Sequence, residues 1–170
     1  GMWYVIRTKA GSEEAVRKRA KKLLAADTSR DCKVLYCIRK KRYLGEWHEE
    51  KERLLPGYVF LVADDPEGAA GVLKGIPESV KLLGYGEKAW PVGKEEEELL
   101  SRLTGEKDEI GMSYGVIEGG VLKIERGVLS GLEASVRKID RHKRKGYIGL
   151  TLPGEGEKLV GVGLEITEKS

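Results

Sequence analysis

The chain has 170 residues, which is long for one small domain and enough for two. Its 31 Lys and Arg residues nearly balance 28 Asp and Glu residues, so the net charge of +3 by itself is only a weak sign of a polyanionic partner. The distribution says more, because six of the nine residues from Arg137 to Lys145 are Lys or Arg, and only Asp140 opposes them. The charge pattern predicts a local basic patch on an otherwise nearly neutral protein.

Hydropathy and cysteine usage give an expectation about the compartment. The apolar run that begins at Trp3 ends at Arg7, too early for a signal peptide, and no segment approaches the length of a membrane span. Cys32 and Cys37 stand five residues apart on a strand-like run, so we expect half-exposed thiols on opposite faces, without the spacing of a disulfide or zinc site. We therefore expect a cytoplasmic protein with no membrane association, and a monomer.

The first two thirds of the chain alternate between strand and helix signals. Strands are predicted at residues 3–8, 32–38, 54–62 and 80–83, and the apolar run from Leu54 to Val62 is typical of a central strand covered on both faces. Helices are predicted after Ser12 as an N-cap, after Asp65 with Pro66 in the first turn, and over residues 94–103. The charged stretch from Glu46 to Arg53 is interpreted as a hairpin arm or a mobile loop. This order predicts an α+β domain, an antiparallel sheet with flanking helices.

The last third lacks a helical stripe. Periodicity lapses over residues 106–115, which we interpret as a linker between a domain of residues 2–105 and one of residues 116–170. Short strands at residues 121–124, 133–139, 147–152 and 159–166, separated by glycines, predict a small all-β, SH3-like barrel. Val136 and Ile139 differ in parity, so both can point inward only if a β-bulge lies near Arg137 or Lys138.

The sequence offers little support for an enzymatic function. The segment from His48 to Glu52 begins like a zinc-protease helix, but Glu52 stands where the second histidine is needed. No glycine loop has the strand-to-helix context of a nucleotide site, and Ser130 lies outside any nucleophile elbow. We therefore expect no catalytic residues, no metal and no cofactor.

One set of motifs consists of Trp3-Tyr4-Val5, Gly11-Ser12-Glu13 and Pro56-Gly57-Tyr58-Val59. In this order the motifs resemble the N-terminal domain of the NusG family of transcription elongation factors. A second set runs from Leu122 through Gly131-Leu132-Glu133-Ala134 to Ile139 and is similar to a KOW motif, with Ala134 where most such motifs have glycine. The resemblance covers nearly the whole chain.

The resemblance implies a partner for the first domain. Proteins of this family bind RNA polymerase through it, against the clamp helices of the largest subunit, and they alter pausing and termination. Carried over by motif, the RNA polymerase-binding residues are Tyr4, Leu55, Pro56 and Tyr58. An exposed aromatic residue beside a Pro-Gly turn would suit such a helical partner. The alternative, that Tyr4 and Tyr58 only fill the core, stays open.

The basic patch suggests a more specialised role. A KOW loop this basic resembles the LoaP group of processive antiterminators, similar proteins that are thought to be recruited by an RNA hairpin. Without an aromatic cluster beside the loop other than Tyr147, recognition of backbone and shape in structured RNA is favoured over stacking on single strands. The predicted RNA-binding residues are Lys123, Arg126, Arg137, Lys138, Arg141, His142, Lys143, Arg144 and Lys145.

Three alternatives remain at this point. The loop could be a solvated surface in a general elongation factor whose KOW domain docks a protein. The chain could instead be a stand-alone RNA-binding protein of ribosomal type that never meets polymerase. Contact with the DNA of the open transcription bubble is a further possibility that the sequence leaves open.

Overall fold

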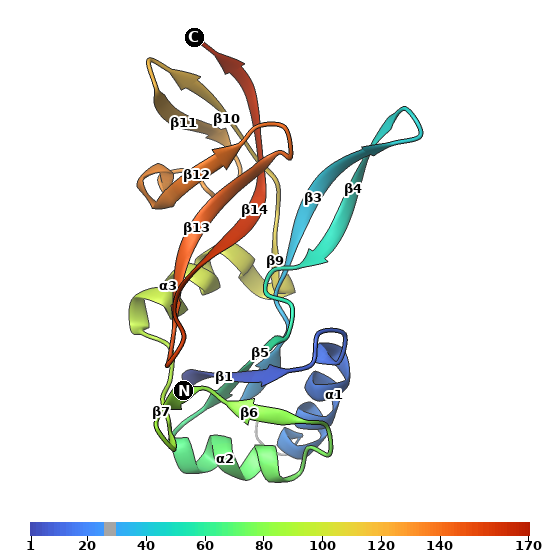
Figure 1. The fold of residues 1–170 in the computed structure, drawn as a ribbon, viewed down its shortest axis with the longest axis vertical. Helices are drawn as coiled ribbons and strands as arrows, with labels where there is room; N and C mark the ends of the chain where they lie inside the picture. The colour runs from blue at the N-terminus through green and yellow to red at the C-terminus, as the bar shows by residue number, and fades with distance from the viewer. Residues whose placement is uncertain (26–29) are drawn as a thin grey trace. The chain divides into compact units, whose positions relative to one another are not determined.

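An antiparallel four-stranded sheet organises the first part of the chain in the computed structural model, which describes residues 1–25 and 30–170 (Figure 1). The strands are β1 (Met2–Thr8), β2 (Asp31–Lys33), β5 (Tyr58–Ala63) and β6 (Val80–Leu82), in the order β2-β5-β1-β6. The near-continuous runs of β-branched and aromatic residues in β1 and β5 suit strands buried on both faces, and Tyr4, Ile6 and Phe60 are fully buried. The predicted antiparallel sheet and its central strand are confirmed.

Two helices pack on this sheet and touch each other: α1 (Glu13–Leu24) and α2 (Pro66–Lys74). Helix α2 begins after Asp65 with Pro66 in its first turn, as predicted, and the Asp65 carboxylate caps it by accepting the Gly68 N–H at 2.6 Å. Ser12 stands at the N-cap of α1 but makes no side-chain cap bond, so the expected Ser12 cap is wrong. The short hairpin of β7 (Gly84–Tyr85) and β8 (Lys88–Ala89) and the helix α3 (Lys94–Thr104) follow.

A long hairpin arm replaces the single strand predicted at residues 32–38. It consists of β3 (Tyr36–Tyr43) and β4 (Glu46–Arg53), which pair along their whole length around a turn at Leu44 and Gly45. The hairpin interpretation of residues 46–53 is therefore confirmed. Cys32 and Cys37 lie on separate strands and are both buried, 1 % and 2 % exposed, so the expected half-exposed thiols are wrong. Burial raises the pKa of Cys32 to about 12 and that of Cys37 to about 11, which keeps both as thiols.

A five-stranded sheet dominates the last part of the chain. Its strands are β10 (Ser113–Glu118), β11 (Val121–Arg126), β12 (Val136–Asp140), β13 (Lys145–Leu152) and β14 (Gly156–Lys169), in the order β11-β10-β14-β13-β12. Most elements expected here are present, but residues 133–135 form the 3-10 helix η2 (Glu133–Ser135) instead of the start of a strand. The strand β10 was missed, because its glycine at position 115 and the polar residues before it concealed the signal.

The interval predicted as a linker, residues 106–115, is structured. It holds the 3-10 helix η1 (Gly105–Lys107), the strand β9 (Glu109–Ile110), which pairs with β3, and the start of β10. The chain clusters into two units: residues 1–35, 55–98 and 151–157 form the first, and residues 36–54, 99–150 and 158–170 form the second. The arm thus belongs to the second unit. Across residues 1–25 and 30–170, no helix has both the length and the apolar character needed to span a membrane.

Candidate nucleic-acid interface

The turn between β12 and β13 carries the densest part of the basic patch. The pairing of β12 with β13 shifts register between Val136 and Lys138, so Arg137 is the bulged residue. This confirms the bulge predicted from the parity of Val136 and Ile139, and it leaves Arg137 and Lys138 exposed. The strand then ends in a turn over residues 141–144 before β13 begins.

Asp140 stabilises this turn. Its Oδ1 accepts the Lys143 N–H at 3.0 Å, and this hydrogen bond holds the pKa of Asp140 below its usual value. Arg144 adopts a left-handed φ of +52°, which is uncommon for a residue with a side chain. The single acidic residue of the patch therefore shapes the loop, and Arg141, His142 and Lys143 are exposed at its tip.

The arm brings a second set of cations to this turn. A hollow of about 830 Å³ lies between the two, with residues from β3 and β4 on one side and from the turn and the start of β13 on the other. Its lining consists of Arg39, Lys40, Lys41, Arg42, Trp47, Glu52, His142, Lys143, Arg144 and Lys145. We call this hollow the basic cleft.

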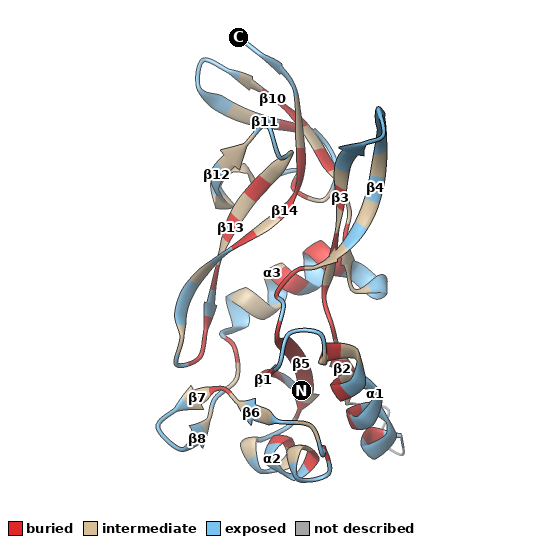
Figure 2. Ribbon diagram, turned by 45° about the vertical axis from the view of Figure 1, so that its right-hand side comes forward, coloured by how far each residue is buried: buried red, intermediate tan, exposed pale blue. Residues whose placement is uncertain are grey.

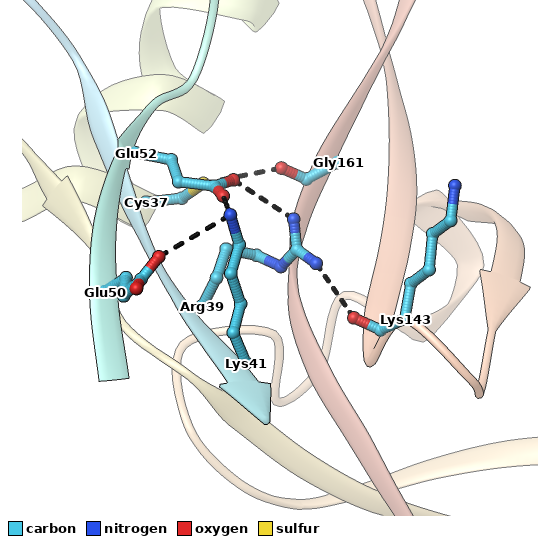
Figure 3. A network of polar contacts seen from close by, with 7 residues as sticks. All are labelled: Cys37, Arg39, Lys41, Glu50, Glu52, Lys143 and Gly161. Atoms are coloured by element: carbon cyan, nitrogen blue, oxygen red, sulfur yellow. Dashed lines mark hydrogen bonds and ion pairs between the residues drawn. The ribbon is translucent and has the colours of Figure 1, made fainter. Parts of the chain in front are cut away.

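A buried arginine joins the two walls of the basic cleft (Figure 3). Arg39 is only 5 % exposed; its Nη1 donates to Glu52 at 3.1 Å and its Nη2 to the Lys143 carbonyl at 2.8 Å. The Lys41 ammonium pairs with both Glu52 and Glu50 on β4. Figure 3 shows the Lys143 side chain pointing away from this network, so its charge is not used in joining the walls.

The contacts within this network favour the charged forms of Glu52 and Lys41. Burial acts to raise the pKa of Glu52, but the hydrogen bond from Lys41 and the nearby charge of Arg39 outweigh it and lower that pKa. The same hydrogen bond raises the pKa of Lys41. Glu52 is therefore ionised and Lys41 protonated at neutral pH, so the ion pairs within the arm persist, and a charge-assisted hydrogen bond from Arg39 to the Lys143 carbonyl links the arm to the turn.

Arg144 is the most constrained cation of the turn. Its Nε donates to Glu165 of β14 at 3.0 Å, and its guanidinium carbon lies 3.6 Å from the ring centroid of Trp47 on β4. Glu165 also pairs with Lys40 at 3.6 Å. An aromatic face and a carboxylate thus fix one orientation of a planar cation.

The nine residues predicted to bind RNA do not form one cluster. Four of them, His142 to Lys145, line the basic cleft, and Arg141 lines a smaller hollow of about 310 Å³ beside it. Arg137 and Lys138 line a different hollow, of about 480 Å³, together with the start of β11. Lys123 and Arg126 lie on β11, at the opposite edge of the sheet order from β12, where Arg126 stacks on Tyr114 at 4.2 Å.

Sequence reasoning missed the contribution of the arm. The run from Arg39 to Arg42 and the nearby Trp47 are visible in the sequence, and a basic run with an aromatic residue is a signal worth following. Their proximity to residues 142–145 is a product of tertiary structure, because about a hundred positions separate the two segments. No periodicity or motif encodes that contact.

The residues predicted to bind polymerase are mostly covered. Tyr4 is fully buried, Leu55 and Tyr58 are each 8 % exposed, and only Pro56 is exposed. The Tyr58 hydroxyl donates to Glu155, whose carboxylate also pairs with Arg7 at 2.8 Å. The expected exposed aromatic beside the Pro-Gly turn is thus absent, because Tyr58 as well as Tyr4 is buried, in agreement with the core-filling alternative. The binding role of the four residues stays a prediction.

A buried carboxylate connects the two sequence motifs of the first unit. Glu13 is fully buried; its Oε1 accepts the Gly11 N–H and its Oε2 the Gly57 N–H, both at 2.7 Å. Gly57 has a φ of +88°, which a residue with a side chain would adopt only under strain. The Gly11-Ser12-Glu13 and Pro56-Gly57-Tyr58 segments are therefore joined in the structure: the glutamate holds the turn that positions Pro56.

Comparison with known proteins gives a match over the part of the chain that holds these two motifs. The family model described as transcription termination factor nusG matches residues 1–101, more than half of the chain. The chain belongs to the NusG family. A curated relative, the transcription termination/antitermination protein NusG of Lactococcus lactis, is 26 % identical over 147 residues, which cover 83 % of this chain and 80 % of that protein.

The fold of a solved NusG agrees with this assignment. The structure of Thermotoga maritima NusG, described as showing a domain interaction, matches with a TM-score of 0.53 and 22 % identity, and covers 97 % of this chain and 93 % of that one. NusG proteins are transcription termination and antitermination factors. In the part of the chain that the structure describes, no group of three or more His, Cys, Asp or Glu side chains is arranged to hold a metal ion.

Proposed function

We propose that this NusG protein is an elongation and antitermination factor that binds RNA polymerase through residues 2–105 and an RNA hairpin through residues 116–170. The observation that carries the RNA part is the turn over residues 141–144, where one carboxylate is used inside the loop while the Arg141 and Lys143 side chains are exposed. A cationic loop presented in this way attracts a phosphate backbone. The closest functional analogy is with the LoaP-type antiterminators, and the compartment is the cytoplasm.

We place the RNA-binding turn on a KOW domain of the SH3-like barrel type. The Ile124 N–H of β11 donates to Glu133 of η2 at 3.2 Å, which brings one edge strand of the five-stranded sheet to the segment that leads into the other edge strand. Such a link supports closure of the sheet into a barrel. A closed barrel would also remove the unpaired edges of β11 and β12.

We place polymerase binding at the exposed Pro56 and its neighbours Leu55 and Tyr58, and the fully buried Tyr4 lies on the adjacent strand β1 of the same sheet. The clamp helices of the largest polymerase subunit are the proposed partner. A pull-down of the full chain with an isolated clamp-helix fragment tests this. Retention that is lost in Pro56→Asp supports the assignment, whereas absence of retention would favour the stand-alone RNA-binding alternative.

The RNA part is tested by a gel-shift series with hairpin, single-stranded and duplex RNA at about 50 and 200 mM salt. We expect the hairpin to bind most tightly, and the triple variant Arg141→Ala, Lys143→Ala, Arg144→Ala to bind at least tenfold more weakly. Unchanged affinity in the triple variant would contradict the proposal. It would then favour a general elongation factor whose second domain docks a protein.

A further inference from the structure

The basic cleft has a larger charge than its ion pairs can neutralise. Its lining holds seven cations, Arg39, Lys40, Lys41, Arg42, Lys143, Arg144 and Lys145. Three carboxylates, Glu50, Glu52 and Glu165, pair with members of this set, which leaves 7 − 3 = +4. An uncompensated charge of this size inside one hollow favours a polyanionic ligand over a single small anion.

Four of these cations fall into two groups with different tasks. Arg39 and Lys41 are engaged with Glu52 within the arm, and Arg39 also holds the arm to the turn through the Lys143 carbonyl. Arg42 and Lys143 are exposed and make no ion pair with a carboxylate in residues 1–25 and 30–170. One group builds the walls of the cleft, and the other supplies charge to whatever enters it.

The spacing of the cations suits a repeating chain of charges. Alternate residues of a strand lie about 7 Å apart on one face, so Lys40 and Arg42 form a short row along β3. Lys143 and Lys145 continue the positive lining on the other wall. Several cations on two walls, two of them in a row along a strand, match a phosphodiester backbone better than an isolated phosphate.

Arg144 is held in an orientation that leaves two of its nitrogens available to a ligand. Glu165 holds its Nε and Trp47 covers one face of its guanidinium, while its Nη1 and Nη2 make no hydrogen bond to the described residues. Those two nitrogens form the fork that binds phosphate oxygens in a bidentate manner. Trp47 is 45 % exposed, so the stack sits where a ligand in the cleft would reach it.

We propose that the β3–β4 arm is the second wall of the RNA site: the basic cleft binds the phosphodiester backbone, with Arg42 as a direct contact and Trp47 as the residue that orients Arg144. This inference rests on the proposed RNA function and extends it to a segment outside residues 116–170. Recognition would then require the arm and the turn together. Neither wall alone would account for the affinity.

The test is fluorescence anisotropy of the full chain with a labelled RNA hairpin, and with a DNA hairpin of the same sequence, at about 50 and 200 mM salt. We expect Arg42→Gln and Trp47→Leu each to weaken RNA binding about fourfold at the higher salt, with the slope of log affinity against log salt falling by about 0.9 for the lost phosphate contact. Arg19→Gln, an exposed arginine on α1, is the matched control and should leave both quantities unchanged. Similar affinity for DNA would identify shared phosphodiester recognition, and a preference for RNA would identify RNA as the ligand.

A double-mutant cycle separates orientation of Arg144 from mere loss of packing. If Trp47 acts through Arg144, Trp47→Leu should have little further effect in an Arg144→Ala background. Arg144→Lys, which keeps the charge but not the planar fork, should bind as weakly as Trp47→Leu. Additive effects would overturn the orienting role.

The outcomes distinguish the two proposals. Steep, salt-dependent RNA binding that is unchanged in Arg42→Gln and Trp47→Leu would overturn the role of the arm and leave the turn as the RNA site. Failure of the unmodified chain to bind either hairpin at about 50 mM salt would overturn both, and would point to an acidic protein as the ligand of the cleft.

Discussion

The region with the family motifs and the region with the basic patch differ in the burial of their distinctive residues. Tyr4 and Glu13, from the family motifs, are fully buried and serve the structure of the sheet and the Pro56-Gly57 turn. Around the basic cleft the outer parts of β3 and β4 are exposed, as Figure 2 shows. The motif that identifies the family is thus largely a folding motif, while the surface features that could distinguish this member lie elsewhere.

Replacing Glu13 should have the largest effect and tests whether the family motifs serve the fold. In Glu13→Ala the Gly11 and Gly57 N–H groups lose a charged acceptor in a buried site, so we expect the free energy of unfolding to fall by about 3 kcal/mol. Urea unfolding measures this. Glu14→Ala, which removes a partly exposed ion pair with Arg17, is the control and should cost less than about 1 kcal/mol. Equal effects would mean that Glu13 has no special structural role.

Removing Arg39 tests how the cleft is held together. Arg39→Met removes a buried charge that joins Glu52 to the Lys143 carbonyl, and we expect a loss of about 2 kcal/mol in the free energy of unfolding. The RNA affinity should fall as well, because the two walls would no longer be fixed. A variant that loses stability but binds RNA at full strength when folded would show that the arm is not part of the site.

The pH dependence of the same network gives a smaller effect. The folded-state pKa of Glu52 is lowered, so its contribution to stability is fully present above the ordinary glutamate pKa of about 4.3 and is lost as pH falls through the depressed folded value. We expect Glu52→Gln to flatten the acid limb of the stability profile between about pH 5 and pH 3. Urea titrations across that range measure it, and a profile parallel to that of the unmodified chain would contradict the assigned pKa direction.

The smallest effect is expected at Tyr4. Its hydroxyl is buried and has no hydrogen-bond partner in the described residues, and burial raises its pKa. Tyr4→Phe should therefore leave the free energy of unfolding unchanged or slightly higher, and should leave retention on the clamp-helix fragment unchanged. Weaker retention in this variant would mean that the Tyr4 hydroxyl reaches the polymerase, which its burial here argues against.

Local patterns in the sequence predicted much of the fold. The strand around Tyr4, the helix after Asp65 and the bulge at Arg137 depend on neighbouring residues, and each was found where the pattern indicated. Elements with weaker local signals were missed, such as β10 with its glycine at position 115. The basic cleft could not be predicted, because it depends on a tertiary contact between Arg39 and Lys143 that no spacing encodes.

The most direct test of the account is the salt dependence of RNA-hairpin binding by the unmodified full chain. If about four to six basic side chains meet phosphates, log affinity should fall with log salt at a slope of about −3 to −5. The slope should move toward zero by about 0.9 when Arg42, on the arm, is replaced by glutamine. A slope near zero in the unmodified chain would contradict the claim that the exposed cations of this NusG protein bind a nucleic-acid backbone.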